Sequence, residues 1–592
     1  MSIIVQKFGG TSVADTDKIL SAARKAIRAQ QAGHQVVMVV SAMGKNTDML
    51  VGLARQISDR PPAREMDMLL STGEQVSVAL MAIAIDSLGC KAVSLTGAQI
   101  GIKTDSSHTK ARIKSILTER IHKLLNDGNI VIAAGFQGID EDFNITTLGR
   151  GGSDLTAVAL AAVLQADACE IYTDVDGVYT TDPRKLPEAR RVAQISYDEM
   201  LELASLGAGV LHSRSVEFGK KFGVPIHVRS SFGDEPGTMV VAEPEAPNQP
   251  VAGAAVTKDE ARVTVSDVPD RPGTSYAILS RIAEKNISVD MIVQNVGAEG
   301  KADISFTVLR DDLPLTKEAV GEALRDLGAG TLEYDDNVSK VSAVGLGMAR
   351  QTGVAHKMFR ALCDAGINLQ MITTSEIKIS VLVEQGCALD ALRTVHRTFH
   401  LETPPSQSSQ PMADDGAGST TDALTVITSL AGMEDLVIEG VGLDDTQARI
   451  TIGDVPDRPG IAAAVFEKIA AGGVFVDMIV QSSGHEGRAI LSFTAPAEDL
   501  EMAVQLSRDI ATEVGCGAVT GSPRVAKLSV SGVGMRSHTG VAMRMFKSLA
   551  DAGINVEMIS TSEMRVNVVV DGQHGAQGLE CLEAAFSDVL LT

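Results

Sequence analysis

A lysine and a pair of glycines near the N-terminus are the first residues whose types and spacing could do chemistry. The stretch Lys7-Phe8-Gly9-Gly10-Thr11-Ser12 lies between an apolar run at 3–5 and a helical pattern at about 14–31. A strand, a glycine turn and a helix in that order direct backbone N–H groups and a helix N-terminus at an anion. Lys7 adds a point charge there. The G-x-x-x-x-G-K-[ST] phosphate loop is absent, and an ordinary turn is the alternative interpretation.

A second glycine-rich turn carries an arginine. The run 148–154, LGRGGSD, follows a buried strand at 129–133, a turn that holds Phe136 and a hairpin at 140–147, and it precedes an apolar helix at 155–164. Ser153 and Asp154 are good N-cap residues, which is the purely structural interpretation. Arg150 favours a binding role, because its planar guanidinium beside exposed N–H groups suits a carboxylate.

Further polar residues follow predicted strands. The run VVMVVS at 36–41 predicts a buried parallel strand that ends in a polar loop with Ser41 and Thr47. Ligands of open α/β sheets bind at that edge. Glu74 belongs to the run STGE, near the start of a helix predicted at 69–88. It is either a first-turn carboxylate favoured by the helix dipole or a ligand group.

A strand predicted at 168–173 leads into a long loop, TDVDGVYTTDPR. Asp-Gly and Asp-Pro pairs mark tight turns in it. Tyr179 and Arg184 project from this loop, an arrangement that suits the base and phosphates of a nucleotide. A last strand is expected at 225–229. Because strands alternate with helices throughout, residues 1–243 predict a three-layer α/β domain with a mostly parallel sheet.

Composition limits the class of protein. The 592 residues call for several domains, and a net charge of −23 argues against nucleic acid as a partner. Six cysteines form no C-x-x-C pair, so neither a zinc site nor a disulfide framework is expected. No signal peptide and no apolar run of about 18 residues is evident. These features predict a cytoplasmic protein that does not bind membranes.

The second half repeats itself. The heptapeptide DVPDRPG at 267–273 recurs at 454–460, and GLGM at 345–348 recurs as GVGM at 532–535, both 187 residues later. A second period of 80 relates Gly273 to Gly353. Each unit reads as a ferredoxin-like βαββαβ pattern. The expected units are 251–335, 336–401, 424–521 and 522–592, with a flexible Pro/Ser/Gly-rich linker at 402–423.

Taken together, the motifs carry a family resemblance. KFGGTSV at 7–13, STGE at 71–74, GRGGSD at 149–154 and TDVDGVYTTDPR at 173–184 resemble the aspartate kinases of the amino-acid kinase superfamily. The four repeats resemble ACT domains, which are small-molecule sensors. Four copies depart from the usual two and suggest a duplicated pair. The resemblance therefore implies an amino-acid-kinase fold followed by four ACT units.

The resemblance implies transfer of the ATP γ-phosphoryl group to the side-chain carboxylate of L-aspartate, the first step towards lysine, threonine and methionine. Mg²⁺ would accompany ATP on phosphates and water, without a protein metal site. The catalytic residues would be Lys7 and Asp154. The implied ATP-binding residues are Lys7, Phe8, Gly9, Gly10, Ser41, Thr173, Asp174, Tyr179 and Arg184. The implied aspartate-binding residues are Ser41, Thr47, Glu74, Phe136, Arg150, Gly151, Gly152, Ser153 and Asp154.

The ACT resemblance implies feedback inhibition by lysine, threonine or both. The implied effector residues are Asp270, Gly273, Asp290 and Gln294, facing Asn368 and Leu369, with a duplicate set of Asp457, Gly460, Asp477 and Gln481, facing Asn555 and Val556. The Thr-Ser-Glu runs at 374–376 and 561–563 are expected to line the same pockets. A homodimer is the default, although the extra pair could replace a second subunit. The alternatives are another amino-acid kinase, acting on glutamate, N-acetylglutamate or uridylate, and a sensor with a vestigial kinase domain.

Overall fold

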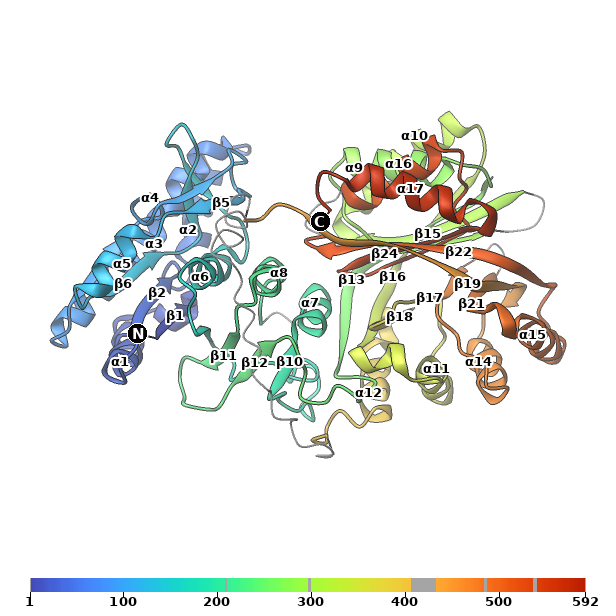
Figure 1. Ribbon diagram of the computed structural model, residues 1–592, viewed down its shortest axis with the longest axis horizontal. Coiled ribbons are helices and arrows are strands. Elements are labelled where there is room, and N and C mark those ends of the chain that lie inside the picture. Colours follow the sequence, from blue (N-terminus) through green and yellow to red (C-terminus); the bar gives the residue numbers. More distant parts are fainter. Residues whose placement is uncertain are drawn as a thin grey trace.

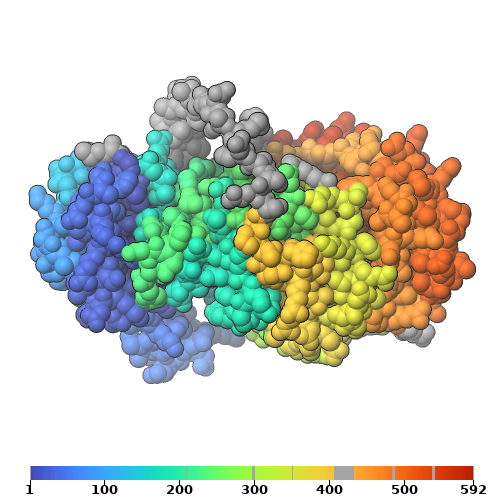
Figure 2. Space-filling view, turned by 90° about the horizontal axis from the view of Figure 1, so that it is seen from below, coloured from blue at the N-terminus to red at the C-terminus, as the bar shows by residue number. Residues whose placement is uncertain are grey.

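The computed structural model describes residues 2–207, 210–296, 300–405, 433–483, 487–535 and 540–590. The chain forms two regions that lie side by side. Residues coloured blue to green, up to about 250, form the first, and those coloured light green to red form the second (Figure 1). Figure 2 shows the same order from below, with blue at one end of the molecule and orange to red at the other.

The first region is built on a parallel sheet. Within its described residues eight strands take the order β10-β12-β11-β9-β1-β2-β6-β3, and each neighbouring pair is parallel except β11–β12. The strands are β1 (Ile3–Phe8), β2 (Gln35–Val40), β3 (Ala92–Leu95), β6 (Ile130–Ala134), β9 (Ala168–Thr173), β10 (Gln194–Ser196), β11 (Ile226–Ser230) and β12 (Thr238–Val241). This confirms the mostly parallel α/β fold.

Helices cover both faces of this sheet. In β2, Met38 and Val40 pack in the core beneath α1 and α3, while Val37 and Val39 pack in the core beneath α5, α6 and α8. A strand buried on both faces explains the continuous apolar run at 36–41. The helices are α1 (Thr16–Gln31), α2 (Asn46–Ile57), α3 (Ala63–Ser87), α4 (Gly97–Ile100), α5 (Glu119–Asn126), α6 (Gly152–Val163), α7 (Tyr197–Ser205) and α8 (Ser213–Phe222), with a 3₁₀ turn η1 (Gly10–Val13).

A small sheet sits beside the main one. In the described part of the chain its order is β5-β4-β7-β8, and β7 and β8 form the predicted hairpin. Its strands are β4 (Ile102–Thr104), β5 (Ile113–Ile116), β7 (Gln137–Ile139) and β8 (Ile145–Thr147).

Three details differ from the sequence-based expectation. Helix α3 begins at Ala63 rather than near residue 69, so Glu74 lies in the helix interior and not in its first turn. Strand β12 follows the strand expected to be last. Among the described helices, α3 is also long and apolar enough to cross a membrane by length and composition. Half of that apolar window is buried inside the fold.

The second region is a continuous sheet of long strands. Over the described residues from 253 onward, twelve strands take the order β14-β15-β13-β16-β18-β17-β20-β21-β19-β22-β24-β23. They are β13 (Gly253–Pro269), β14 (Val289–Val296), β15 (Lys301–Leu309), β16 (Thr331–Val344), β17 (Met371–Thr374), β18 (Lys378–Glu384), β19 (Val437–Pro456), β20 (Ile479–Ser483), β21 (Arg488–Pro496), β22 (Val519–Val533), β23 (Met558–Thr561) and β24 (Arg565–Asp571).

This sheet folds into two facing layers with helices outside both. Figure 1 shows α9, α10, α16 and α17 above the strands and α11, α12, α14 and α15 below them. A methionine-rich core that includes Met291, Met371, Met478 and Met558 fills the space between the layers. The helices are α9 (Thr274–Glu284), α10 (Leu313–Leu327), α11 (Val354–Asp364), α12 (Ala388–Thr398), α14 (Ile461–Ala471), α15 (Leu500–Val514), α16 (Gly540–Asp551) and α17 (Gly575–Phe586).

The ACT units are interleaved rather than consecutive. Residues 253–257 of β13 pair with 340–344 of β16, so a strand that precedes the first unit completes the second. In the same way 437–444 of β19 pair with 527–533 of β22 and complete the fourth. The expected limits at 335/336 and 521/522 therefore fall inside β16 and β22. A long strand that crosses both layers produces this exchange, which a linear repeat does not reveal. Residues 406–423 of the expected linker lie outside the described residues.

Candidate active site and effector pockets

The side chains of Lys7 and Asp154 meet at the carboxyl edge of the parallel sheet. Lys7 is two residues after Val5 on β1, so its side chain points to the same face of the sheet, towards α6 rather than α1. Asp154 lies in the first turn of α6. The distance from Lys7 Nζ to Asp154 Oδ1 is 2.5 Å, and both side chains are largely buried. The pair places a fixed cation where the glycine turn at 9–10 begins.

The alternation of side chains along β1 places the Phe8 ring on the face of the sheet opposite to Lys7. The Phe8 side chain is fully buried and stacks on Tyr172, with ring centroids 4.7 Å apart. The ring therefore belongs to the core beneath α1, and only the main chain of Phe8 lies at the strand end. There its carbonyl oxygen accepts a hydrogen bond from the Ser41 N–H at 3.1 Å, which joins the ends of β1 and β2.

A close approach of α3 brings Glu74 into the site. A Cβ atom at Gly73 would lie 2.8 Å from the Ala42 Cβ, so glycine is required for the helix to pack this close to the loop after β2. The approach lets Glu74 Oε1 accept the Ala42 N–H at 3.1 Å. Thr47 lies in the first turn of α2, beyond the same loop.

Glu74 is a buried ionisable group with an incomplete set of hydrogen bonds. Its side chain is 3% exposed, and its Oε2 atom has no hydrogen-bond partner among the described residues. Burial raises the pKa of Glu74 to about 7, against the lowering by backbone hydrogen bonds. A buried carboxylate with a vacant oxygen is costly unless a cation binds it. This arrangement therefore suits the ammonium group of a small substrate.

The turn that carries Arg150 depends on backbone conformations with positive φ and on a close approach to His212. Gly151 has φ 72°, and a Cβ atom there would lie 2.4 Å from atoms of His212. Phe136 also has a positive φ, 70°, and its N–H donates to Thr156 Oγ1 at 3.1 Å. The Arg150 side chain is exposed at this turn. The turn and the N-terminus of α6, with Gly152 and Ser153, stand beside the Lys7–Asp154 pair, as an anion site requires.

The loop after β9 starts at the same sheet edge. Thr173 Oγ1 donates to Asp174 Oδ1 at 3.1 Å, and the Tyr179 hydroxyl donates to Asp176 Oδ1 at 2.8 Å. Arg184 is exposed and pairs with Asp182. Asp174 and Arg184 are thus solvent-facing groups on the loop that follows β9, the strand next to β1.

Sequence reasoning missed a buried aspartate that braces the site. Asp67 is fully buried and accepts hydrogen bonds from Thr147 Oγ1 at 2.5 Å and from the Thr109 N–H, and it pairs with His108 Nδ1 at 2.7 Å. It holds the 105–110 loop and β8 against α3. Asp67 and Glu74 are seven residues apart, which places them on one helix face. The seven-residue spacing from Glu74 is the sequence feature from which Asp67 could have been predicted as part of the site.

The effector residues come together with their partners exchanged. Asn555 Nδ2 donates to Asp270 Oδ1 at 2.7 Å, and Gln294 Nε2 donates to the Val556 carbonyl at 2.5 Å. In the other set Asn368 Nδ2 donates to Asp457 Oδ1 at 2.7 Å, and Gln481 Nε2 donates to the Leu369 carbonyl at 3.1 Å. The predicted facing pairs were therefore wrong. The first unit pairs with the fourth, and the second pairs with the third.

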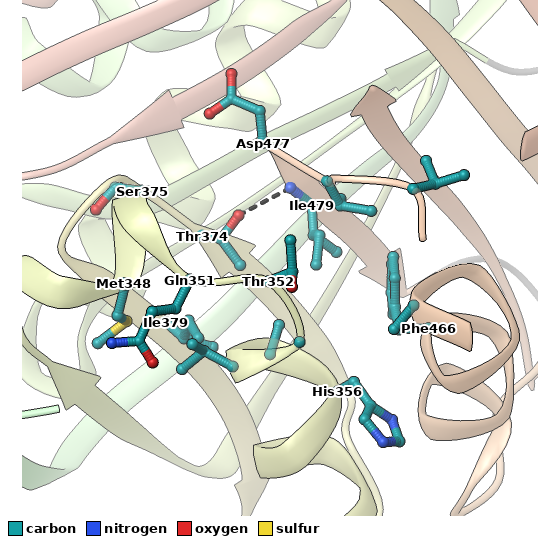
Figure 3. A pocket seen from close by; sticks show the side chains of 16 residues that line it. Met348, Gln351, Thr352, His356, Thr374, Ser375, Ile379, Phe466, Asp477 and Ile479 are labelled. Carbon is teal, nitrogen blue, oxygen red and sulfur yellow. Dashed lines mark hydrogen bonds between the residues drawn. The ribbon is translucent and has the colours of Figure 1, made fainter. Parts of the chain in front are cut away.

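Two of the expected effector residues belong to other pockets. Asp477 lines a cavity between the second and third units, with Gln351, Thr352, His356 and Phe466 (Figure 3). There Thr374 Oγ1 accepts the Ile479 N–H at 2.8 Å. Asp290 lines the corresponding cavity between the first and fourth units, which also includes Thr561, Ser562 and Glu563. Thr374 and Ser375 of the first Thr-Ser-Glu run thus line the Asp477 cavity, whereas Glu376 lines a separate cavity at the kinase boundary, and all three residues of the second run line the Asp290 cavity.

No group of three His, Cys, Asp or Glu side chains among the described residues is placed to hold a metal ion. The strand-end site instead offers Lys7, backbone N–H groups and one ion-paired carboxylate. This donor set fits a divalent ion that arrives on nucleotide phosphates.

Comparison with known proteins agrees with this architecture. The model of the amino acid kinase family matches residues 2–230, and an ACT domain model matches 341–399 and 528–586. The chain is an ATP-dependent kinase with a duplicated ACT region. It is 50% identical over 409 residues to aspartate kinase of Pseudomonas putida, covering 69% of this chain and all of that protein. The chain belongs to the aspartate kinase family.

Solved structures extend the likeness. The crystal structure of aspartate kinase from Synechocystis is 40% identical, covers 99% of this chain and 98% of its own, and has a TM-score of 0.52. E. coli aspartokinase III is 26% identical, and its structures cover 67% of this chain and 99% of theirs. The complex with aspartate and ADP has a TM-score of 0.57, and the complex with lysine and aspartate has a TM-score of 0.53.

Proposed function

We propose that this protein transfers the ATP γ-phosphoryl group to the side-chain carboxylate of L-aspartate, giving 4-phospho-L-aspartate and ADP. The observation that carries the proposal is the buried Glu74 carboxylate with a vacant Oε2 atom and a raised pKa. An amino-acid substrate supplies the ammonium group that this carboxylate lacks. The aspartate and ADP bound by the E. coli relative support the same acceptor and nucleotide.

The proposed roles follow from charge and position. Lys7 balances charge on the transferring phosphoryl group with the N–H groups of Gly9 and Gly10, and Asp154 orients Lys7. Arg150 binds the substrate α-carboxylate, and Glu74 binds its ammonium group. Ser41, Thr47, Phe136 and the 151–153 turn complete the pocket. Thr173, Asp174, Tyr179 and Arg184 hold the nucleotide.

The acceptor needs no general base. A carboxylate with an ordinary pKa of about 3.9 is ionised at neutral pH, so its oxygen attacks the γ-phosphorus as the bond to the ADP oxygen breaks. Catalysis then rests on positioning and charge stabilisation. Mg²⁺ bound to the nucleotide phosphates supplies further charge neutralisation.

The test is ATP-dependent formation of aspartyl hydroxamate from L-aspartate and hydroxylamine, with Mg²⁺ present. Glutamate and N-acetylglutamate serve as comparison acceptors in the same assay, and uridylate, whose phosphoanhydride product gives no hydroxamate, is compared by ADP release. Aspartate-dependent product is the expected result. Product from another acceptor alone would assign a different amino-acid kinase activity, and no product from folded protein would leave the sensor interpretation.

We further propose feedback inhibition through a buried carboxylate of the kinase domain. Glu202 of α7 is fully buried and pairs with Lys378 at 2.8 Å, and it accepts the Glu563 N–H at 2.9 Å. Burial raises the pKa of Glu202 while Lys378 opposes the rise. Glu563 lines the cavity of the first and fourth units. Ser375, which lines the other cavity, donates its N–H to the Lys378 carbonyl. Glu202 thus contacts structures that line both cavities.

Replacing Glu202 by glutamine is expected to weaken inhibition by lysine or threonine about tenfold, since allosteric coupling of about 1–3 kcal/mol is at stake. The uninhibited rate should change little, because Glu202 does not touch the proposed substrate site. The measurement is the effector concentration that gives half-maximal inhibition, with the melting temperature as a folding check. Asp198→Asn on the same helix removes a carboxylate that pairs with Lys220, a lysine that also lies 3.7 Å from Glu439 of the ACT region, and it serves as the comparison variant at the same domain boundary. Unchanged inhibition in Glu202→Gln contradicts this route.

Other features are proposed on the same basis. The effector residues are Asp270, Gly273, Gln294, Asn555 and Val556 in one set and Asp457, Gly460, Gln481, Asn368 and Leu369 in the other, with Asp290 and Asp477 in the separate cavities. Lysine and threonine are the proposed effectors, and lysine binds the E. coli relative. We retain a cytoplasmic homodimer without nucleic-acid or membrane partners as a proposal, together with a catalytic domain at 1–243 followed by four ACT units whose limits at 335/336 and 521/522 are shared within β16 and β22. Light scattering of the purified chain tests the dimer.

A further inference from the structure

A short segment behind the linker region docks on the kinase domain. Figure 1 shows it as the orange stretch that leaves the ACT strands and reaches the kinase region beside β5. Met433 is fully buried in the kinase core. The Met433 and Glu434 N–H groups donate to the carbonyls of Lys114 and Ile113, at 3.4 and 3.3 Å, and Lys221 Nζ donates to the Met433 and Asp435 carbonyls at 3.1 Å each.

Glu434 forms the strongest contact of this segment. The Arg214 guanidinium at the start of α8 donates to both carboxylate oxygens, with Nη2 2.7 Å from Oε1 and 2.9 Å from Oε2. Oε2 also accepts the Ile113 N–H at 2.6 Å. The Glu434 side chain is 8% exposed. A bidentate pair of this kind fixes the plane of the guanidinium.

A further donor of Arg214 reaches the residue before the substrate turn. Nη1 donates to the Leu148 carbonyl at 2.5 Å, and Nη2 donates to the Ala111 carbonyl at 3.1 Å. Leu148 directly precedes the Gly149-Arg150-Gly151 turn. Two residues before Arg214, His212 packs against Gly151. The start of α8 therefore contacts both ends of the turn, and Glu434 fixes the arginine that holds one of them.

We infer that Glu434 is a positioning residue for the substrate turn, acting through Arg214. Without its carboxylate, Arg214 has no bidentate partner, and the Leu148 carbonyl loses a donor of fixed orientation. Arg150 then no longer lies where it binds the substrate carboxylate. The inference rests on the proposed function, because it assigns substrate binding to this turn. It also makes the segment that leads into the second ACT pair part of the substrate site's support.

The test compares Glu434→Gln with Asp435→Asn in the full-length chain. Both remove one negative charge from neighbouring residues, but Asp435 is exposed, and it accepts a hydrogen bond from the kinase domain through its main-chain carbonyl. Glu434→Gln is expected to lower kcat/KM for aspartate by about 10–100-fold, since small misplacements near a reacting group cost this much. The effect should fall on KM for aspartate and not on KM for ATP. Asp435→Asn should resemble the wild-type protein.

A double-mutant cycle and hydrogen exchange complete the test. Arg214→Lys should cost a similar factor, and adding Glu434→Gln should cost little more, because both act through one guanidinium. Amide exchange of residues 145–152 should be faster in Glu434→Gln, independently of any activity assay. A Glu434→Gln variant with a lower melting temperature but unchanged aspartate KM and unchanged exchange would overturn the inference. Absence of aspartate-dependent product in the wild-type protein would overturn the proposed function instead, and the exchange result would still decide the positioning role.

Discussion

Replacing Lys7 by alanine is expected to lower kcat for hydroxamate formation by at least about 10³-fold, since a preorganised charge at the reacting group is worth this much or more. Lys7 Nζ lies 2.5 Å from Asp154 at the strand end where the glycine turn begins. Because charge develops on the phosphoryl oxygens during transfer, loss of this cation raises the barrier rather than only weakening binding. The rate is measured with ATP and aspartate both saturating.

The control for Lys7 is another ion-paired lysine of the same domain. Lys220 lies near the C-terminal end of α8 and pairs with Asp198 at 2.8 Å, and Lys220→Ala should keep its activity within about threefold, as partly exposed pairs contribute little. Lys7→Ala leaves Asp154 without its cation, so a loss of stability is expected as well. Melting temperatures must therefore accompany the rates. A folded Lys7→Ala variant that keeps a tenth of the activity would exclude Lys7 as the phosphoryl-binding cation.

The strand-end residues could be predicted because their geometry is local. Lys7, Ser41 and Thr173 each end a buried apolar run, and the carboxyl ends of parallel strands meet at one edge of a sheet. The order of apolar runs and glycine turns along the chain was therefore enough to place them together. The same reasoning identified the turn before α6, whose glycines and helix N-terminus lie within one stretch of sequence.

The burial of the Glu74 side chain could not be predicted in this way. It depends on the contact between Gly73 and Ala42, two segments joined only by packing, and on a helix that starts a turn and a half earlier than the pattern suggested. The brace at Asp67 and the contact from Glu434 to Arg214 are likewise long-range. No local pattern marks a carboxylate whose partner is more than two hundred residues away.

The exchanged effector pairs have a related cause. Both copies carry the same Asp-Arg-Pro-Gly turn, so the sequence does not tell which unit each turn will face. The choice is made by β13 and β19, which cross both layers and fix the first unit beside the fourth and the second beside the third. Repeat detection gives the number of units, whereas strand exchange decides their neighbours.

Replacing Glu74 by glutamine is expected to lower kcat/KM for aspartate by about 10²–10³-fold, the cost of removing one partner from a buried charge pair. The amide oxygen still accepts the Ala42 N–H, so the local fold is kept. Glu65→Gln, an exposed position on the same helix, is the control with the same chemical change. If Glu74→Gln binds aspartate as the wild-type protein does, the ammonium group lies elsewhere.

The raised pKa gives this variant a second signature. In the wild-type protein Glu74 must be ionised to bind ammonium, so kcat/KM for aspartate should fall tenfold per pH unit below about 7. Glu74→Gln should lack this limb of the profile.

The raised pKa of Glu74 has the opposite consequence for the stability of the fold: a rise in pH favours aspartate binding but lowers the free energy of unfolding. The folded Glu74 holds its proton more tightly than the unfolded chain, whose carboxyl has a pKa near 4.5. The substrate-free fold therefore loses stability as pH rises from about 4.5 to 7, by about 3 kcal/mol in all. Glutamine carries no charge, so Glu74→Gln should melt at a higher temperature than the wild-type protein at pH 8 and at a similar temperature at pH 4.5. A variant that is more stable yet binds aspartate poorly would show that the vacant carboxylate is kept for the substrate and not for the fold.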